Sequence, residues 1–310
     1  MKIWKVFAIV FAVGLGFLLL GRSAAQGGTV ELLNVSFDTT RELYRELGER
    51  FTRRHPGIVL RSSHGPSGAQ ARAVIGGLKA DIVSLALGSD IDALADRGFV
   101  TGGRVAPFTS TIVLIVRKGN PKGIRGWDDL VRGDVSVITP NPKTSGGARW
   151  NFLAAWGHVT LRGGSEEKAF EFVRRLFARV PVLDTGARAS TTTFAQKGIG
   201  DVLIAWESEA RLALKEVGGL EIVMPEETIL AEPPVAIVDR NVDARGTRAA
   251  AEAFVQFLHT DEAQEAIGRH GFRPVTRRGS PFTLEQVAGT WRDAQKKFFS
   301  DGALFDRIYP

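Results

Sequence analysis

A short segment at residues 140–150 combines residue types suited to holding an anion. Pro140 and Pro142 keep the chain out of helical conformation, while Gly146 and Gly147 let the main chain approach a ligand closely. Residues 148–156 then carry helix-forming and apolar side chains, so the glycines fall at the start of a helix. The first N–H groups of a helix lack intrahelical partners, and the helix dipole adds partial positive charge there. The segment therefore predicts a site for sulfate, phosphate or carboxylate, although a plain turn has the same pattern.

Three further segments share this design, in which a predicted strand runs into a loop rich in Ser, Thr or Gly and then into a helix. In parallel α/β sheets such loops gather at the carboxyl ends of the strands, where ligands bind. Any one loop is explained by an ordinary helix N-cap, which is worth about 1 kcal/mol. Together they favour a shared anion site. The four segments are residues 34–39, 63–68, 144–147 and 184–190.

The order of predicted elements indicates an α/β protein with two lobes. Strands and helices alternate along residues 30–96 and again along residues 135–224, which predicts a mostly parallel sheet flanked by helices in each lobe. In the second stretch we expect, among others, a strand at residues 180–183 and a short helix at residues 190–197. The pattern breaks at Pro233 and Pro234, and helices follow. We infer that the chain passes from the first lobe to the second and later returns. These two crossings form a hinge, with a ligand cleft between the lobes. We expect a signal peptide at residues 1–25, a first lobe formed by residues 26–110 and 231–310, and a second lobe formed by residues 111–230.

The N-terminal segment has the composition of a secretory signal peptide. Lys2 and Lys5 precede an apolar run at residues 6–20, and small residues lead up to Ala25. This run is shorter than the about 20 residues that a membrane-spanning helix needs. We therefore expect export to the periplasm, with cleavage after Ala25.

Composition excludes several other classes of protein. The chain has no cysteine, so an exported form depends on its apolar core rather than on disulfides. Loss of residues 1–25 removes three basic residues and lowers the formal charge from +6 to +3. The remaining basic residues alternate with acids, which argues against a nucleic-acid partner. The five histidines form no close pair in the sequence, which argues against a metal site. We expect a monomer without a cofactor.

Five segments resemble the sulfate/thiosulfate-binding proteins of bacterial ABC importers, and the resemblance covers nearly all of the chain after residue 25. The longest segment contains the loop at residues 140–150. The five are LLNVSFD at 32–38, SHG at 63–65, PFTSTIV at 107–113, VITPNPKTSGGARWN at 137–151 and GIGDVLIAWE at 198–207.

The resemblance implies a type II periplasmic binding protein, not an enzyme, that delivers its anion to a membrane ABC permease. It also implies that sulfate or thiosulfate is held by hydrogen-bond donors without a direct countercharge. We expect Arg149 and Arg188 to hold the donor loops in place, and His64 to make a structural hydrogen bond to backbone. The donors that the resemblance implies are the backbone N–H groups of Asp38, Ser67, Gly146, Gly147 and Ala187, the hydroxyl of Ser145 and the indole Nε1 of Trp206.

Two points stay open at this stage. Trp206 ends a buried strand, where its indole can donate but not accept, and core packing is the alternative role. A donor-only site favours sulfate over phosphate, because an unpaired phosphate proton costs about 1–3 kcal/mol. Asp38 supplies an acceptor if its carboxylate faces the ligand, so a receptor for another oxyanion, such as phosphate or molybdate, is the alternative. An enzyme with Ser145 as nucleophile lacks the G-x-S-x-G motif around that serine.

Overall fold

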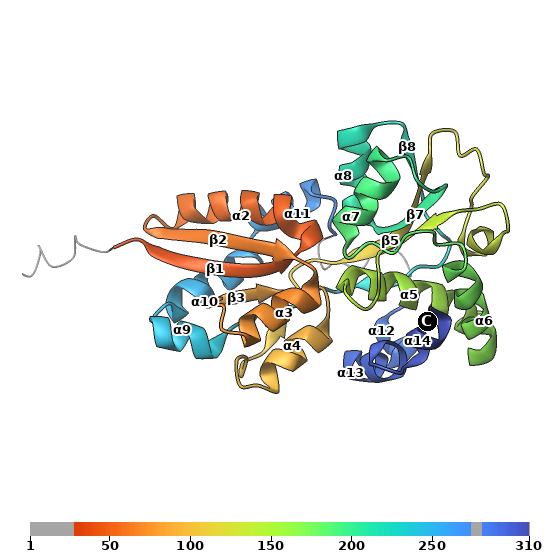
Figure 1. Ribbon diagram of the computed structural model, residues 1–310. Helices are drawn as coiled ribbons and strands as arrows, with labels where there is room; N and C mark the ends of the chain where they lie inside the picture. The colour runs from red at the N-terminus through yellow and green to blue at the C-terminus, as the bar shows by residue number, and fades with distance from the viewer. Residues whose placement is uncertain (1–27, 274–280, 310) are drawn as a thin grey trace, which may run out of the picture.

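The computed structural model describes residues 28–273 and 281–309 and shows two α/β lobes side by side (Figure 1). The expected signal peptide lies outside the described residues. Each lobe contains one sheet flanked by helices, which confirms the predicted architecture. Across the described ranges, no helix is both long and apolar enough to cross a membrane.

The sheet of the first lobe has five strands in the order β2-β1-β3-β10-β4. They are β1 (Val30–Phe37), β2 (Ile58–Gly65), β3 (Ile82–Ser84), β4 (Arg104–Val105) and β10 (Val235–Ile237). β1 pairs in parallel with β2 and β3, and the register sets Phe37 opposite Gly65. The loops after β1 and β2 therefore leave the sheet at the same edge, as expected of two of the candidate anion loops.

The sheet of the second lobe has four strands in the order β6-β7-β5-β8. They are β5 (Ser110–Arg117), β6 (Val137–Ile138), β7 (Val202–Trp206) and β8 (Leu220–Val223). β6 and β7 are parallel, whereas β5 is antiparallel to β7 and β8. A short strand, β9 (Leu230–Ala231), pairs with the first residues of β5.

Each sheet has one reversed strand, and in both cases it is the first strand formed after the chain crosses from the other lobe. β10 is antiparallel to β3 and β4, just as β5 is antiparallel to its neighbours. The other strands of each sheet share one direction. The two connecting segments are paired through Ser110 with Ala231 and Thr111 with Leu230, so the hinge is a hydrogen-bonded pair of strands.

The helices of the first lobe bury one apolar face each. In α2 the residues Leu43, Leu47 and Phe51 recur at helical spacing and are fully buried. α2 packs against β2 and α11, and α10 packs against β1 and β10. These elements are the 3₁₀ turn η1 (Asp38–Thr40) and the helices α2 (Arg41–Arg54), α3 (Ser67–Ile75), α4 (Gly88–Ala95), α9 (Asp239–Arg245), α10 (Arg248–Phe257) and α11 (Asp261–Arg269).

The second lobe is organised around α5 (Gly146–Thr160), which is buried on most of its surface. It lies between the sheet, α6 and the C-terminal helices (Figure 1). The other elements are the 3₁₀ turn η2 (Trp127–Val131), α6 (Glu166–Phe177), α7 (Ala187–Thr191), the π-helical turn η3 (Thr192–Gln196) and α8 (Glu207–Val217).

The C-terminal segment corrects the expected assignment of all of residues 231–310 to the first lobe. Its elements are α12 (Leu284–Ala288), α13 (Trp291–Ala294), the π-helical turn η4 (Gln295–Phe299) and α14 (Leu304–Ile308). α12 packs against α5 and α14 against α6, while α13 also contacts α4 of the first lobe. The rings of Phe298 and Phe299 lie 5.4 and 5.2 Å from that of Phe152 in α5. α5 is apolar on several faces, and these aromatic side chains cover the face that the sheet leaves exposed.

Residues 180–183 differ from the expected strand. They form an irregular connection, in which Pro181 has no N–H to give to a sheet. The helix expected at residues 190–197 begins earlier, at Ala187, and ends as the turn η3.

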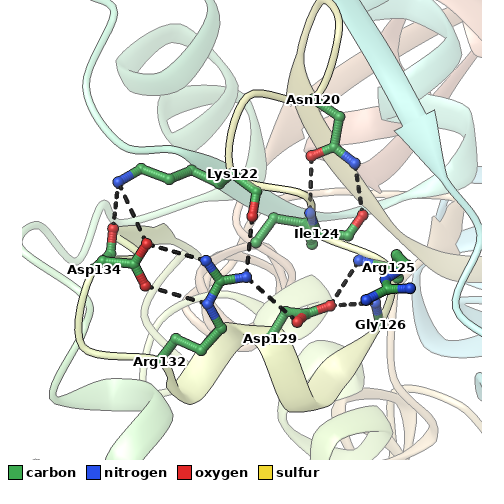
Figure 2. A network of polar contacts seen from close by, with 8 residues as sticks. All are labelled: Asn120, Lys122, Ile124, Arg125, Gly126, Asp129, Arg132 and Asp134. Atoms are coloured by element: carbon green, nitrogen blue, oxygen red, sulfur yellow. Dashed lines mark hydrogen bonds and ion pairs between the residues drawn. The ribbon is translucent and has the colours of Figure 1, made fainter.

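The long connection between β5 and β6 is held by side-chain hydrogen bonds rather than by regular structure (Figure 2). Asn120, which has a left-handed φ of 46°, donates to the carbonyl of Ile124 at 2.7 Å and accepts from its N–H at 2.9 Å. Asp129 accepts from the N–H of Arg125 at 2.7 Å. Arg132 donates to both carboxylate oxygens of Asp134, at 3.2 and 3.0 Å. The contacts of Asp129 and Arg132 are solvent-exposed, so they fix the path of the loop more than they stabilise the lobe, whereas those between Asn120 and Ile124 are partly buried.

A pair of glycine substitutions tests the packing of the C-terminal segment. A Cβ on Gly157 in α5 would lie 2.6 Å from Phe282, whereas one on Gly48 in α2 would make an ordinary contact with Leu60 at 3.5 Å. Alanine gains up to about 1 kcal/mol of helix propensity at either site. We expect Gly157→Ala to lower the free energy of unfolding by about 1–3 kcal/mol through overpacking, and Gly48→Ala to leave it equal or raise it. Urea unfolding followed by circular dichroism measures both, and equal effects would contradict the packing described.

Candidate functional site

The first wall of the candidate site is the N-terminus of α5, at the end of the loop after β6. The side-chain oxygen of Asn141 accepts from the N–H of Lys143 at 2.8 Å. The backbone carbonyl of Asn141 accepts from the N–H of Ser145, also at 2.8 Å. Ser145 is the N-cap, and its Oγ accepts from the N–H of Ala148 at 3.3 Å. The N–H groups of Gly146 and Gly147 belong to the first helical turn, so the helix provides no acceptor for them.

Trp206 lies beside this helix end. Its side chain is 2% exposed, and Nε1 donates to the Gly147 carbonyl at 3.3 Å. Such a long hydrogen bond is weak, which leaves the indole N–H available for a stronger acceptor. Gly147, Trp206 and Ala187 line one small cavity. The structure therefore brings together three of the donors expected from the sequence, and Ser145 is adjacent to them.

The first lobe meets this wall at Ser67. A Cβ on Gly146 would lie 3.0 Å from the Cβ of Ser67 and 2.9 Å from the Cβ of Ala86. Trp150, one turn further along α5, donates its indole N–H to the Ala86 carbonyl at 2.8 Å. The absence of a side chain at position 146 is thus what lets the N-termini of α3 and α5 face each other.

The hydroxyl of Ser67 is fully used inside the first lobe. Its Oγ donates to Asp90 at 2.5 Å and accepts from the N–H of Ala86 at 3.0 Å. Asp90 is buried, and burial raises the pKa of its carboxyl. Ser67 therefore has its backbone N–H, rather than its hydroxyl, to offer a ligand.

Asp38 and Ala187 face each other from opposite lobes. A Cβ on Gly186, the residue before Ala187, would lie 2.6 Å from Oδ2 of Asp38. The Asp38 carboxylate thus lies against the turn that begins α7. Burial raises the pKa of this carboxyl, and the charges of Arg41 and Arg188 act in the opposite direction.

The two expected supporting arginines bind loop carbonyls and carboxylates. Arg149 donates to the carbonyl of Pro142 at 2.8 Å and to the side chain of Gln295 at 2.7 Å. Arg188 lies 3.0 Å from Glu42 of the first lobe and 2.9 Å from Glu209 of its own lobe. Arg149 thus braces the donor loop, whereas Arg188 is an ion-pair bridge between lobes.

His64 differs from the expectation of a bond to backbone. Its Nδ1 lies 2.6 Å from the hydroxyl of Ser36 on the neighbouring strand. Burial lowers the pKa of the imidazole to about 4, with a further contribution from the charge of Arg41. The ring is therefore neutral at physiological pH and adds no charge to the site.

Sequence reasoning missed two buried carboxylates. Asp90 supports Ser67, and Glu209, at 2% exposure, lines the cavity with Trp206 and Ala187. Burial raises the pKa of Glu209, with the Arg188 charge opposing. The only signal for either was an acidic residue in the first turn of a predicted helix, which is common on protein surfaces.

The site contains no catalytic arrangement. Ser145 accepts a hydrogen bond from Ala148, and no histidine or carboxylate lies within hydrogen-bond distance of its hydroxyl in the part of the chain that the structure describes. Over the same residues, no group of three His, Cys, Asp or Glu side chains is placed to hold a metal ion.

Comparison with known proteins identifies the family. A family model for bacterial extracellular solute-binding proteins matches residues 32–273. The chain belongs to this family. Sulfate-binding proteins of Salmonella typhimurium and Escherichia coli are both 48% identical to it, over 95% and 96% of this chain and 98% of their own length. A thiosulfate-binding protein of Pseudomonas aeruginosa is 44% identical over 94% of this chain and 97% of its own.

Solved structures agree with the fold of this solute-binding protein. The sulfate-binding protein SubI from Mycobacterium tuberculosis matches with a TM-score of 0.81 and 31% identity, over 87% of this chain and 100% of that one. A periplasmic thiamin binding protein, at 16% identity and a TM-score of 0.68, shares the fold alone. These relatives are binding proteins, in agreement with the expectation of a receptor rather than an enzyme.

The protonation state of His64 can be measured directly. Because burial lowers its pKa to about 4, we expect the imidazole signals to titrate near pH 4 and to stay constant between pH 6 and 8. Two-dimensional NMR of histidine-labelled protein measures the midpoint, and a His64→Gln variant assigns the signal. A midpoint near the ordinary value of about 6.5 would mean that the ring is solvated and charged near neutrality.

Proposed function

We propose that the chain is a periplasmic receptor that binds sulfate or thiosulfate and delivers it to a membrane ABC permease. The observation that carries the proposal is that the indole of Trp206 lies beside Gly146 and Gly147 at the N-terminus of α5. These groups present N–H donors, and the helix dipole of α5 adds partial positive charge. Relatives that are named for sulfate or thiosulfate and align over nearly the whole chain support the same ligand class.

In this proposal the ligand is held by the backbone N–H groups of Asp38, Ser67, Gly146, Gly147 and Ala187. The hydroxyl of Ser145 and the indole of Trp206 complete the donor set. Ser145 Oγ already accepts from Ala148, so its proton is free to be donated to the anion. Each lobe supplies donors, so binding favours contact between the lobes, with the paired strands β5 and β9 as the hinge.

The proposed route to the periplasm begins with the segment at residues 1–25, cleaved after Ala25. A receptor monomer then carries the anion to the permease. The match to extracellular solute-binding proteins supports export.

A receptor for another oxyanion is the second candidate. A molybdate-binding protein of Mycobacterium bovis is 29% identical over 40% of this chain. The Asp38 carboxylate faces Gly186 and lies near the donors, where it is the acceptor that a phosphate proton would need. Protonation of the anion therefore separates sulfate from phosphate, whereas molybdate, which like sulfate is an unprotonated dianion near neutral pH, is separated by direct comparison of affinities.

A panel of anions tests the proposal. Isothermal titration of the protein with sulfate, thiosulfate, phosphate and molybdate at pH 7.5 compares the affinities directly. We expect sulfate or thiosulfate to bind about 5- to 150-fold more tightly than phosphate, because an unpaired proton in a dry donor site costs about 1–3 kcal/mol. Tight binding of phosphate without sulfate would overturn the assignment.

Substitution of Trp206 tests the donor that is most specific to this site. Phenylalanine keeps an aromatic ring against Phe37, whose centroid lies 5.3 Å from that of Trp206, but it removes the N–H. We expect Trp206→Phe to weaken sulfate binding about 10- to 100-fold, which corresponds to about 1.5–3 kcal/mol for a hydrogen bond to a charged group. Trp156→Phe is the matched control, since Trp156 is buried against Phe298 on the C-terminal side of α5. Equal affinities for the two variants would remove Trp206 from the site.

A further inference from the structure

A groove on the first lobe lies beside the candidate site and is not part of it. Helix α2 forms one wall and strand β2 the other, and the two lie side by side in Figure 1. The groove has a volume of about 750 Å³. Gly48 lets the helix approach Leu60 of the strand closely along its floor.

The groove carries an excess of positive charge. Its lining includes Arg41, Arg45, Arg53 and Arg61, against a single acid, Glu49. Arg61 pairs with Glu31 at 3.3 Å. The first three arginines are exposed, and within residues 28–273 and 281–309 no carboxylate oxygen lies within 4.0 Å of their guanidinium nitrogens. Their charge is thus available to act on solutes.

The helix dipole favours Arg53, which lies in the last turn of α2, but it does not explain Arg41 and Arg45. Arg41 is the first residue of α2, where the helix dipole disfavours a positive charge. Arg45 follows one turn later on the same exposed face and makes no ion pair in the described structure. The charge at this end of α2 therefore has another role.

One end of the groove opens beside two of the four donor loops. Arg41 directly follows the turn η1, which begins with Asp38, and His64 directly precedes the loop that leads to Ser67. Burial dominates the pKa of Asp38 and of His64, but the charge of Arg41 also acts on both groups. The field of Arg41 therefore reaches the edge of the cleft.

The other charges at this edge are largely balanced. Arg188 is held between Glu42 and Glu209, at 3.0 and 2.9 Å. Asp38 contributes a carboxyl on the same side. An incoming anion thus meets Arg41 and Arg45 as unpaired positive charges at the end of the groove, while Arg72, which is exposed and lies against Gly68, is a further positive charge beside the loop at Ser67.

We propose that this groove is an electrostatic funnel that speeds the association of a divalent oxyanion with the cleft. The inference rests on the proposed function. At an ionic strength of 0.15 M a charge acts over about 8 Å. With a helical rise of 1.5 Å per residue, Arg45 lies about 6 Å along α2 from Arg41, and Arg53 about 18 Å. The effect on association therefore decreases along the helix from Arg41 to Arg53.

Stopped-flow measurement of tryptophan fluorescence on mixing with sulfate gives the association and dissociation rates. At about 0.15 M ionic strength, where a charge acts over about 8 Å, we expect Arg41→Gln to lower the association rate about 2-fold, and Arg41→Gln with Arg45→Gln about 3- to 5-fold. Arg53→Gln is the matched control, since Arg53 lines the same groove farther from the cleft, and it should change the rate by less than about 1.5-fold. Arg41→Lys should keep the wild-type rate. The differences should vanish in about 0.5 M NaCl, where the charges are screened.

The outcomes separate this inference from the proposed function. Wild-type protein that binds neither sulfate nor thiosulfate refutes the proposed function and the funnel with it. Normal sulfate binding with equal association rates in all variants refutes the funnel alone. So does an effect of Arg53→Gln as large as that of Arg41→Gln, or a change confined to the dissociation rate. Circular dichroism spectra verify that each variant is folded.

Discussion

The structure depends on the close approach of Gly146 to Ser67 and Ala86 across the cleft. Only a residue without a Cβ fits there, because a methyl group would lie within about 3 Å of both neighbours. This contact sets two helix N-termini against each other and brings Trp150 within reach of the Ala86 carbonyl. Facing N-termini repel each other electrostatically unless negative charge lies between them. An anion between the two helix N-termini would therefore stabilise this arrangement of the lobes, because the backbone geometry places both positive helix ends against each other.

Most charged side chains near the candidate site stabilise its loops, whereas Glu209 lines the cavity itself. Arg149 braces the loop before α5, Asp90 fixes the hydroxyl of Ser67, and Arg188 joins the lobes through Glu42 and Glu209. Buried charges of this kind cost desolvation energy unless they are paired, and here each has a partner. The proposed donors are peptide, hydroxyl and indole groups, and hydrogen bonds within the protein hold the loops that carry them. Preorganisation of this kind lowers the entropic cost of binding.

Sequence alone predicted the two lobes and the four loops, because strand-loop-helix order determines which segments reach the carboxyl edge of a sheet. Several residues that the family resemblance named lie close to one another in the structure. Asp38 of the first lobe lies against Gly186, and Trp206 lies against Gly147 in the second lobe. The position of the C-terminal helices could not be predicted, since an apolar stripe such as that of Phe298 and Phe299 fits any exposed apolar face. Asp90 and Glu209 were missed for a related reason: the burial of a carboxylate depends on partners distant in the sequence. Residues 180–183 were assigned to a strand from their composition, although Pro181 gives the sheet no hydrogen bond.

The strand order of the first sheet has a consequence for how the protein folds. β10 lies between β3 and β4, yet about 130 residues separate it from β4 in the chain. The first sheet cannot be completed until most of the chain is available, and contacts of such high sequence separation form slowly. The first sheet of a nascent chain therefore stays incomplete until β10 has been synthesised. If residues 1–25 are the export signal that we propose, this delay helps to keep the first lobe open for passage through a secretion channel.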